Sequence, residues 1–174
     1  AGNLPALRRS IYVSFLLIGT VTVLLNVAVF LWIDPILRWL QVPHDVYSLM
    51  RSYLWIIFQG IAFTFLYNFY AALLRAVGDS VTPLWFLAIS VVLNIGLDLF
   101  LILVLDLGIE GTAIATVIAQ GTAASGILLH TYKNRPELRL HWEDMRFDRS
   151  CLKEITSFST LTCIQQSVMN FGIL

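Results

Sequence analysis

The stretch that decides the fold is residues 80–105, which read SVTPLWFLAISVVLNIGLDLFLILVL. It carries a single charged side chain, Asp98, in a long run of Leu, Ile, Val and Phe residues. The hydrocarbon core of a bilayer is about 30 Å thick and a helix rises about 1.5 Å per residue, so about 20 apolar residues span it. Residues 80–105 are therefore predicted to form a transmembrane helix.

Apolar runs of similar length lie on both sides of this stretch. Residues 10–33, 52–74 and 111–132 contain no Asp, Glu, Lys or Arg, and residues 155–174 form a fifth uncharged run that is more polar. Over the whole chain 58% of residues are hydrophobic and 13% are charged, with a net charge of zero, whereas about a quarter of a soluble domain is charged. This composition excludes a disordered chain, a DNA-binding module and an ordinary cytosolic enzyme. We expect an all-α fold, a polytopic transmembrane helix bundle.

The breaks between these runs contain residues that favour turns. Pro35 is expected to kink the first helix, because it lacks a backbone donor and crowds the preceding turn. Gly78 can adopt a positive φ and end the second helix. Thr82 is predicted as the N-cap of the third helix, with Pro83 at its first position. Residues 106–108, Asp-Leu-Gly, are predicted to form a tight turn between the third and fourth helices.

The distribution of Lys and Arg predicts the orientation in the membrane. The chain has 11 Lys and Arg residues, and only Arg38 and Arg51 fall in the loops on one side of the membrane. The other nine lie before the apolar run 10–33, at residue 75, or between residues 133 and 153, which are the loops on the opposite side. The positive-inside rule then places the N-terminal end, the Arg75 turn and the long connector in the cytoplasm. Aromatic residues gather near both predicted interfaces: Trp32, Trp39, Tyr47, Tyr53 and Trp55 outside, and Trp85 and Tyr132 inside.

Asp98 is the polar outlier of the membrane-spanning runs. A carboxylate at the centre of a spanning helix costs roughly 2.5–3.5 kcal/mol on the insertion scale, and such groups usually face a bundle interior or a wet cavity. Asn94 precedes it by four residues, so both side chains lie on one helix face. Insertion alone gives no reason for Asp98, which indicates a functional role.

The facing helix supplies further oxygen atoms. If the two helices turn at Leu107, Asp98 and Thr116 lie at one depth and Asn94 and Gln120 at the next. Thr112 lies four residues before Thr116, on the same face. Carboxylate, amide and hydroxyl oxygens suit a hard cation such as Na⁺, and a proton needs only Asp98.

Structural roles remain open for several of the polar residues. A Thr in a spanning helix often bonds the carbonyl four residues earlier, and Asn and Gln often join neighbouring helices. These roles apply above all to Thr112, Gln59, Asn68 and Asn26. The Gly- and Ala-rich fourth run, residues 111–132, is most simply explained by close helix packing.

Four sequence segments resemble the multidrug and toxic compound extrusion (MATE) transporters. Residues 74–83, LRAVGDSVTP, resemble the family's LRAxGDxxTP turn. Residues 93–98, LNIGLD, and 107–120, LGIEGTAIATVIAQ, resemble its N-x-x-L-D and LGxxGAAxATxxxQ motifs, and residues 164–167, IQQS, occupy the place of a Leu-Gln-Gln motif in family helix seven. The spacing between these segments also matches.

The resemblance implies an architecture for the whole protein. MATE proteins have twelve helices in two lobes, so we expect this sequence to be a fragment that covers family helices three to seven. Residues 1–132 would hold four helices of the first lobe, residues 133–150 the cytoplasmic linker between lobes, and residues 151–174 the truncated start of the second lobe. The protein would lie in the cell membrane as a multi-pass protein, the inner membrane of a bacterium.

The resemblance also implies a function and a site. MATE proteins export organic, often cationic, compounds in exchange for Na⁺ or H⁺. The family's first-lobe cation site maps onto Asn94, Asp98 and Thr116, with Gln120 and Thr112 as possible accessory residues from the depth matching. Its further Asp on family helix one is not contained in this sequence.

Several other expectations follow, together with their alternatives. We expect no enzymatic activity and no cofactor apart from the coupling ion. The expected partners are a small-molecule substrate, the lipid bilayer and the rest of the same polypeptide, and no nucleic acid. The closest alternative is a lipid-linked oligosaccharide flippase or polysaccharide exporter of the same wider superfamily. An intramembrane enzyme would need a second catalytic group near Asp98, and none of the three His residues lies at that depth.

Overall fold

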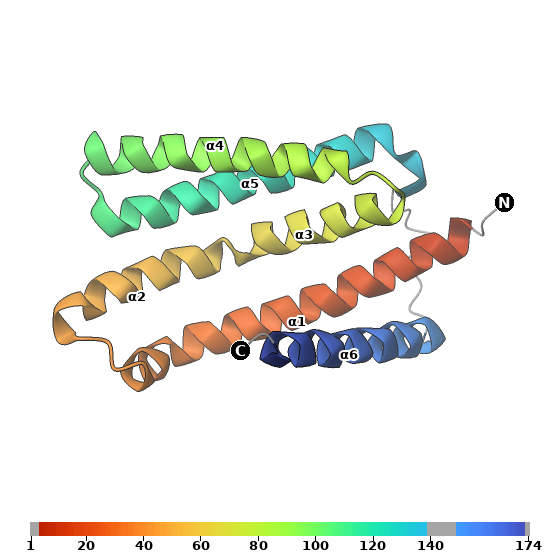
Figure 1. Ribbon diagram of the computed structural model, residues 1–174, viewed down its shortest axis with the longest axis horizontal. Coiled ribbons are helices and arrows are strands. Elements are labelled where there is room, and N and C mark those ends of the chain that lie inside the picture. Colours follow the sequence, from red (N-terminus) through yellow and green to blue (C-terminus); the bar gives the residue numbers. More distant parts are fainter. Residues whose placement is uncertain (1–3, 139–148, 173–174) are drawn as a thin grey trace. The chain divides into compact units, whose positions relative to one another are not determined.

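The computed structural model describes residues 4–138 and 149–172, and this part of the chain is built from helices with no strand. The helices are α1 (Leu4–Trp39), α2 (His44–Gln59), α3 (Ile61–Ala76), α4 (Val81–Leu103), α5 (Gly108–Asn134) and α6 (Arg149–Gly172), with a short 3₁₀ helix η1 (Pro136–Leu138) after α5 (Figure 1). The predicted all-α fold is confirmed.

Three of the described helices, α1, α4 and α5, are long and apolar enough to cross a membrane. Helices α2 and α3 make a fourth span if they are taken together, but a bend of 41° separates them. The predicted single helix over residues 52–74 is therefore wrong in one respect, because the chain breaks at Gly60. Helix α6 covers the fifth predicted run, but it is not among the helices that meet this test.

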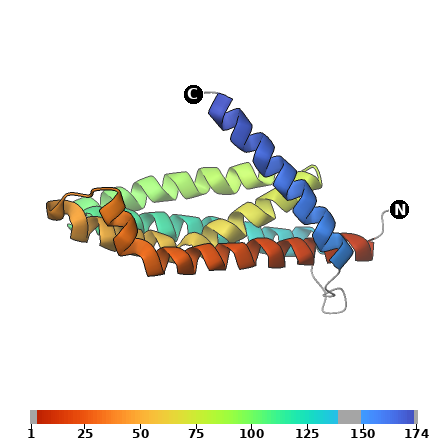
Figure 2. The same cartoon turned by 90° about the horizontal axis from the view of Figure 1, so that it is seen from below.

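The first helix is kinked where the sequence predicts it. Trp32, three residues before Pro35, has non-helical dihedral angles of φ −112° and ψ 17°. Proline crowds the carbonyl four residues earlier and leaves it without a donor, so the strain falls on the preceding turn. The helix resumes and ends at Trp39, and Figure 2 shows this change of direction.

The chain divides into two compact units. One unit, Thr20–Pro136, contains the second part of α1 and helices α2 to α5. The other contains α1 up to Gly19 together with α6 and the part of η1 from Glu137 onward. Within it, Arg8 Nε donates a hydrogen bond to the carbonyl of Glu137 (3.4 Å). The candidate site lies in the larger unit.

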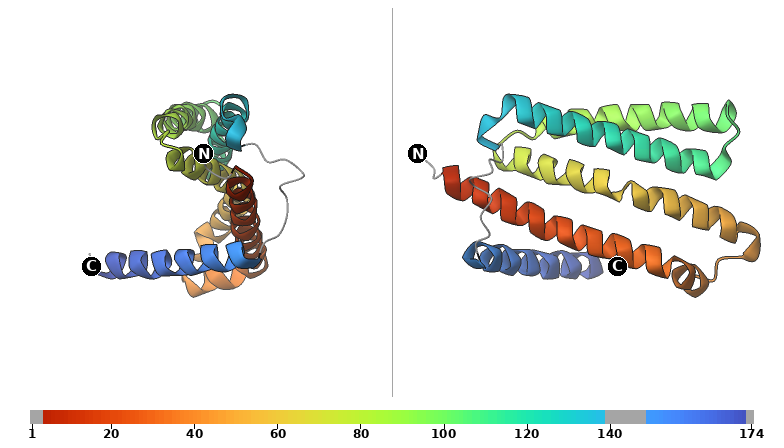
Figure 3. Two further views of the ribbon diagram at one scale, coloured as in Figure 1. Left: turned by 90° about the vertical axis from the view of Figure 1, so that its right-hand side faces the viewer. Right: turned by 180° about the vertical axis from the view of Figure 1, so that it is seen from behind.

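Helix α5 is the centre of the larger unit, where it packs against α4, α3 and α2. Its contact with the antiparallel α4 is the most extensive, and the two helices run side by side in Figure 3. Small side chains on α5 allow this approach: Gly111, Ala113, Ala115, Ala119, Ala123 and Ala124 are all buried. The close-packing role predicted for the Gly- and Ala-rich run is confirmed.

Two of the turns in this unit depend on positive φ angles. Gly78 (φ +86°) follows the end of α3 as predicted, and Asp106 (φ +52°) and Gly108 (φ +53°) shape the turn between α4 and α5. The predicted cap of α4 is wrong, because the helix begins at Val81 and Ser80 occupies the N-cap position. Asp79 performs this role instead: its carboxylate accepts hydrogen bonds from the backbone N–H of Thr82 (3.0 Å) and from the Thr82 hydroxyl (2.8 Å).

Candidate functional site

The predicted site residues come from the two helices that pack most closely. Asn94 and Asp98 lie one turn apart on α4, and Thr112, Thr116 and Gln120 follow at one-turn intervals on α5. None of these five side chains is fully exposed. The two helices therefore bring a carboxylate, amides and hydroxyls toward one interface within the membrane-spanning part of the chain.

Asn94 and Thr116 join the two helices directly. Asn94 Nδ2 donates a long hydrogen bond to Thr116 Oγ1 (3.4 Å), and the Thr116 hydroxyl donates in turn to the carbonyl of Thr112 (2.9 Å). The hydroxyl proton of Thr116 is thus used within α5, as is common for Thr in spanning helices. A lone pair of Thr116 Oγ1 and the amide oxygen of Asn94 remain able to accept a donor or a cation.

This contact corrects the depth matching made from the sequence. Thr116 lies opposite Asn94, whereas the sequence arithmetic paired it with Asp98. The reason is the position of the turn: α4 already ends at Leu103 and α5 begins at Gly108, so the connection is centred before Leu107. The two helices are consequently displaced relative to each other from the predicted register.

Asp98 has the most unusual environment of the site. Its Oδ1 atom is buried and has no hydrogen-bond partner in the described part of the chain. An ionised carboxylate without a partner in a poorly solvated site is costly. Binding of a cation or a proton at this oxygen would remove that cost, which is the chemistry that an ion-coupling site requires.

Gln120 does not join the Asn94 pair as the arithmetic predicts. Its side-chain oxygen accepts a hydrogen bond from the hydroxyl of Thr64 on α3. Thr64 also lies within hydrogen-bonding distance of the carbonyl of Gly60 (3.5 Å), at the bend between α2 and α3. Gln120 therefore links α5 to the broken helix, and Thr112 contributes its backbone carbonyl to Thr116.

The interhelical role considered for Asn26 is confirmed, whereas the hydrogen bond of Asn68 stays within its own helix. Asn26 Nδ2 donates to the carbonyl of Phe58 (2.7 Å) and so joins α1 to α2, as the predicted interhelical role requires. Asn68 is exposed and donates a hydrogen bond to the carbonyl of Thr64 on its own helix (2.9 Å).

Within residues 4–138 and 149–172, no three His, Cys, Asp or Glu side chains gather into a metal-binding group.

The sequence analysis missed an ion pair at the end of the unit opposite the α4–α5 turn. Arg135, just after α5, lies 3.5 Å from Oδ2 of Asp79 in the turn before α4. Hydrogen bonds from Thr82 and the nearby Arg135 guanidinium lower the pKa of Asp79 below its ordinary value. The signal was present in the sequence, since Asp79 belongs to the conspicuous LRAVGDSVTP segment, but its partner lies 56 residues later, in a part of the sequence with no pairing pattern.

Comparisons with known proteins agree with this picture. The family model MatE matches residues 1–100, which include Asn94 and Asp98. The chain is 43% identical to the probable multidrug resistance protein YpnP of Bacillus subtilis over 59% of its length and 23% of that protein. It is 39% identical to the probable multidrug resistance protein YoeA of the same organism, over 66% of the chain and 24% of YoeA.

A more distant relative covers more of the chain. The probable multidrug resistance protein NorM of Thermotoga maritima is 29% identical over 75% of the chain and 29% of NorM. The chain thus spans about a quarter of the length of the curated relatives it matches. No solved structure matches it. The family model covers more than half of the sequence and the apolar helices are long enough to span a bilayer, so the chain belongs to the MatE family and is a multi-pass protein of the cell membrane.

Proposed function

We propose that this chain is part of a secondary antiporter that exports organic, often cationic, compounds in exchange for Na⁺ or H⁺. Its relatives carry the names of multidrug resistance proteins, which supports a transporter rather than an enzyme. The observation that carries the proposal is the buried, unpartnered Oδ1 of Asp98 beside the Asn94–Thr116 contact.

Asp98 is the coupling residue in this proposal. A cation or a proton neutralises its carboxylate, and this changes the free energy of packing α4 against α5. The ion then has different affinities for two conformations of the protein, which is the condition for a ligand to shift a conformational equilibrium. Substrate favours the opposite conformation, and exchange of the two across the membrane follows.

Asn94 and Thr116 tune the site without changing its charge. Their neutral oxygens add ligands for Na⁺, which prefers oxygen donors, whereas a proton needs only the carboxylate. Gln120 acts at a distance in this proposal, because its side chain is bound to Thr64 of α3. No cofactor is proposed for this site apart from the coupling ion.

The remaining expectations extend the same proposal to the complete transporter. Residues 1–132 belong to the first lobe, residues 133–150 to the cytoplasmic linker and residues 151–174 to the second lobe; residues 139–148 of this linker lie outside the described part of the chain. The small-molecule substrate binds between parts of the polypeptide that include helices beyond this sequence. The lipid bilayer surrounds the exposed apolar side chains.

An export assay with a matched pair of variants tests the proposal. Asp98→Asn removes the buried carboxylate, and Asp106→Asn makes the same chemical change at an exposed turn residue, where Asn tolerates the positive φ. In cells that produce the complete transporter, Asp98→Asn is expected to abolish ion-driven export of an organic cation, while Asp106→Asn retains it. Equal export by wild type and Asp98→Asn, at equal protein level in the membrane, would contradict the proposal.

A further inference from the structure

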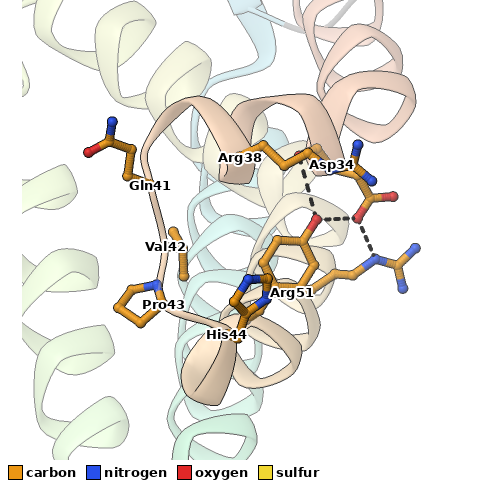
Figure 4. Close-up of a pocket in the computed structure, with 8 residues that line it drawn as sticks. Asp34, Arg38, Gln41, Val42, Pro43, His44 and Arg51 are labelled. Carbon is orange, nitrogen blue, oxygen red and sulfur yellow. Dashed lines mark hydrogen bonds and ion pairs between the residues drawn. The ribbon is translucent and has the colours of Figure 1, made fainter.

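A pocket of about 760 Å³ lies at the connection between α1 and α2, away from the Asp98 site. Its walls include Asp34 and Arg38 from the end of α1, and His44, Tyr47 and Arg51 from α2 (Figure 4). The sequence analysis used Arg38, Arg51 and Tyr47 only to orient the chain in the membrane, and the proposed coupling mechanism does not use these side chains.

Asp34 organises one wall of the pocket. Tyr47 Oη and Arg51 Nε both donate hydrogen bonds to its Oδ1 atom, each at 3.0 Å. Arg51 is bound through Nε, so its two terminal nitrogens remain available as donors, and about half of its side chain is exposed. The single carboxylate of the pocket is therefore already paired and positions Arg51 at the pocket wall.

Arg38 supplies a second positive charge close to Asp34, and it attracts that carboxylate less strongly than Tyr47 and Arg51, which bond it directly. It lies one turn after Asp34, it is exposed, and it makes no hydrogen bond or ion pair with the described residues. Two guanidinium groups thus face one carboxylate, which leaves one positive charge in excess. Asp45 in the first turn of α2 is acidic, but its side chain does not line the pocket.

The beginning of α2 adds to this positive character. Helix α2 has Pro43 at its N-cap and no side-chain acceptor for the backbone N–H groups of its first turn. Such N–H groups carry a partial positive charge and favour a nearby anion. The pocket therefore combines Arg38, the free end of Arg51 and an uncapped helix start.

The location of the pocket identifies the kind of anion that is available there. Trp32 and Trp39 flank the pocket in sequence and are exposed, Trp39 by 83%, as is typical of aromatic side chains at the level of lipid headgroups. Phosphate groups are the anions concentrated at that level, and arginine binds phosphate with paired N–H donors.

We infer that the α1–α2 pocket binds a phosphate group, held by Arg38 and the free nitrogens of Arg51, at the membrane interface that carries few Lys and Arg residues. Two sources share this chemistry, the headgroup of an anionic phospholipid and free inorganic phosphate. This inference is independent of the proposed ion coupling at Asp98. A variant that loses phosphate binding can therefore keep ion coupling, and a variant that loses ion coupling can keep phosphate binding.

A binding titration with charge-matched variants tests the inference. The complete transporter, purified in phosphatidylcholine nanodiscs, is titrated with phosphatidylglycerol in one arm and with inorganic phosphate in the other, and bound molecules are counted by native mass spectrometry. Arg38→Gln removes the exposed guanidinium of Arg38, and Arg38→Lys keeps its charge. Arg75→Gln removes one exposed Arg at the opposite end of α3 and serves as the control.

The inference predicts that Arg38→Gln weakens phosphate-group binding about tenfold or more, that Arg75→Gln leaves it unchanged, and that Arg38→Lys lies between them. Binding only in the phosphatidylglycerol arm identifies the lipid headgroup as the source, and binding in both arms shows that the phosphate group alone suffices. The absence of saturable binding by wild type in both arms would overturn the inference. An equal loss in Arg38→Gln and Arg75→Gln would also overturn it, because attraction would then depend only on total charge.

Discussion

Gly60, at the bend between α2 and α3, lies so close to Val117 of α5 that a Cβ atom on the glycine would come within 2.7 Å of Val117 Cγ2. The missing side chain thus lets the broken helix approach the central helix of the unit. The same bend places Thr64 next to Gln120.

Gly60→Ala is therefore expected to destabilise the helix packing by about 1–3 kcal/mol, the usual cost of adding a methyl group to a close-packed core. Gly96→Ala is the matched control, because no atom lies within 4 Å of a Cβ atom at Gly96. At that helical position Ala is neutral or slightly stabilising. Unfolding in mixed detergent measures the change in the free energy of unfolding for each variant. An equal change in the two variants would show that Val117 does not restrict the side chain at position 60.

The hydrogen bonds that Asp79 accepts from Thr82, together with its ion pair with Arg135, predict a pH dependence of stability. The pKa of Asp79 is lowered in the folded state, so its contribution is present above the ordinary value of 3.8 and is lost as the pH falls through the lower folded-state value. Asp79→Asn cannot be ionised, and it is expected to show a smaller loss of stability than wild type between about pH 5 and pH 3. If the free energy of unfolding fell equally with pH in wild type and Asp79→Asn, this interpretation would be contradicted.

The cap made by the same carboxylate predicts a separate effect at neutral pH. Asp79→Ala removes the acceptor for the Thr82 N–H and is expected to lower the free energy of unfolding by about 1 kcal/mol, the typical cost of losing an N-terminal cap. Asp79→Asn retains an oxygen acceptor and should cost less. Chemical unfolding of the three proteins at pH 7 measures the order, which a purely electrostatic role would not produce.

The orientation follows from the distribution of Lys and Arg and is tested by labelling. A single cysteine at His44, in a chain whose native cysteines are replaced by Ser, is expected to react with an impermeant maleimide added to intact cells. A single cysteine at Arg75 should react only after the membrane is permeabilised. The reverse pattern would show that the chain has the opposite orientation.

The sequence predicted those parts of the fold that depend on local chemistry. The apolar runs predicted the helices, and Pro35 and Gly78 predicted a kink and a helix end that the structure contains. The bend at Gly60 was not predicted, because an isolated glycine in an apolar run is compatible with a continuous helix. The contact of Gly60 with Val117, which is distant in sequence, is visible only in the structure.

The candidate site shows the same division between local and distant contacts. The one-turn spacing of Asn94 and Asp98 on α4 follows directly from helix geometry. The contact between Asn94 and Thr116 does not follow from helix geometry alone. It depends on where the turn between α4 and α5 is centred, because a shift of a few residues changes which side chains meet. The Thr64–Gln120 contact likewise depends on the bend in the neighbouring span.

Thr116 is expected to affect the two possible coupling ions differently. Thr116→Ala removes one neutral oxygen next to Asn94 but leaves the Asp98 carboxylate in place. Export driven by a Na⁺ gradient should therefore weaken more than export driven by a proton gradient. Thr122→Ala, at an exposed Thr on the same helix that also bonds its own i−4 carbonyl, controls for the loss of a hydroxyl. Equal loss in both gradients would assign Thr116 a structural role only.

The central claim is that the carboxylate of Asp98 couples ion movement to substrate movement. The most direct measurement is ion flux in proteoliposomes that contain the complete transporter, driven by an imposed gradient of an organic cation and followed with Na⁺- and pH-sensitive dyes inside the vesicles. The wild-type protein is predicted to move Na⁺ or H⁺ against the direction of substrate flow, and Asp98→Asn is predicted to produce no such ion movement. Substrate-driven ion movement of the same size in Asp98→Asn would contradict the claim.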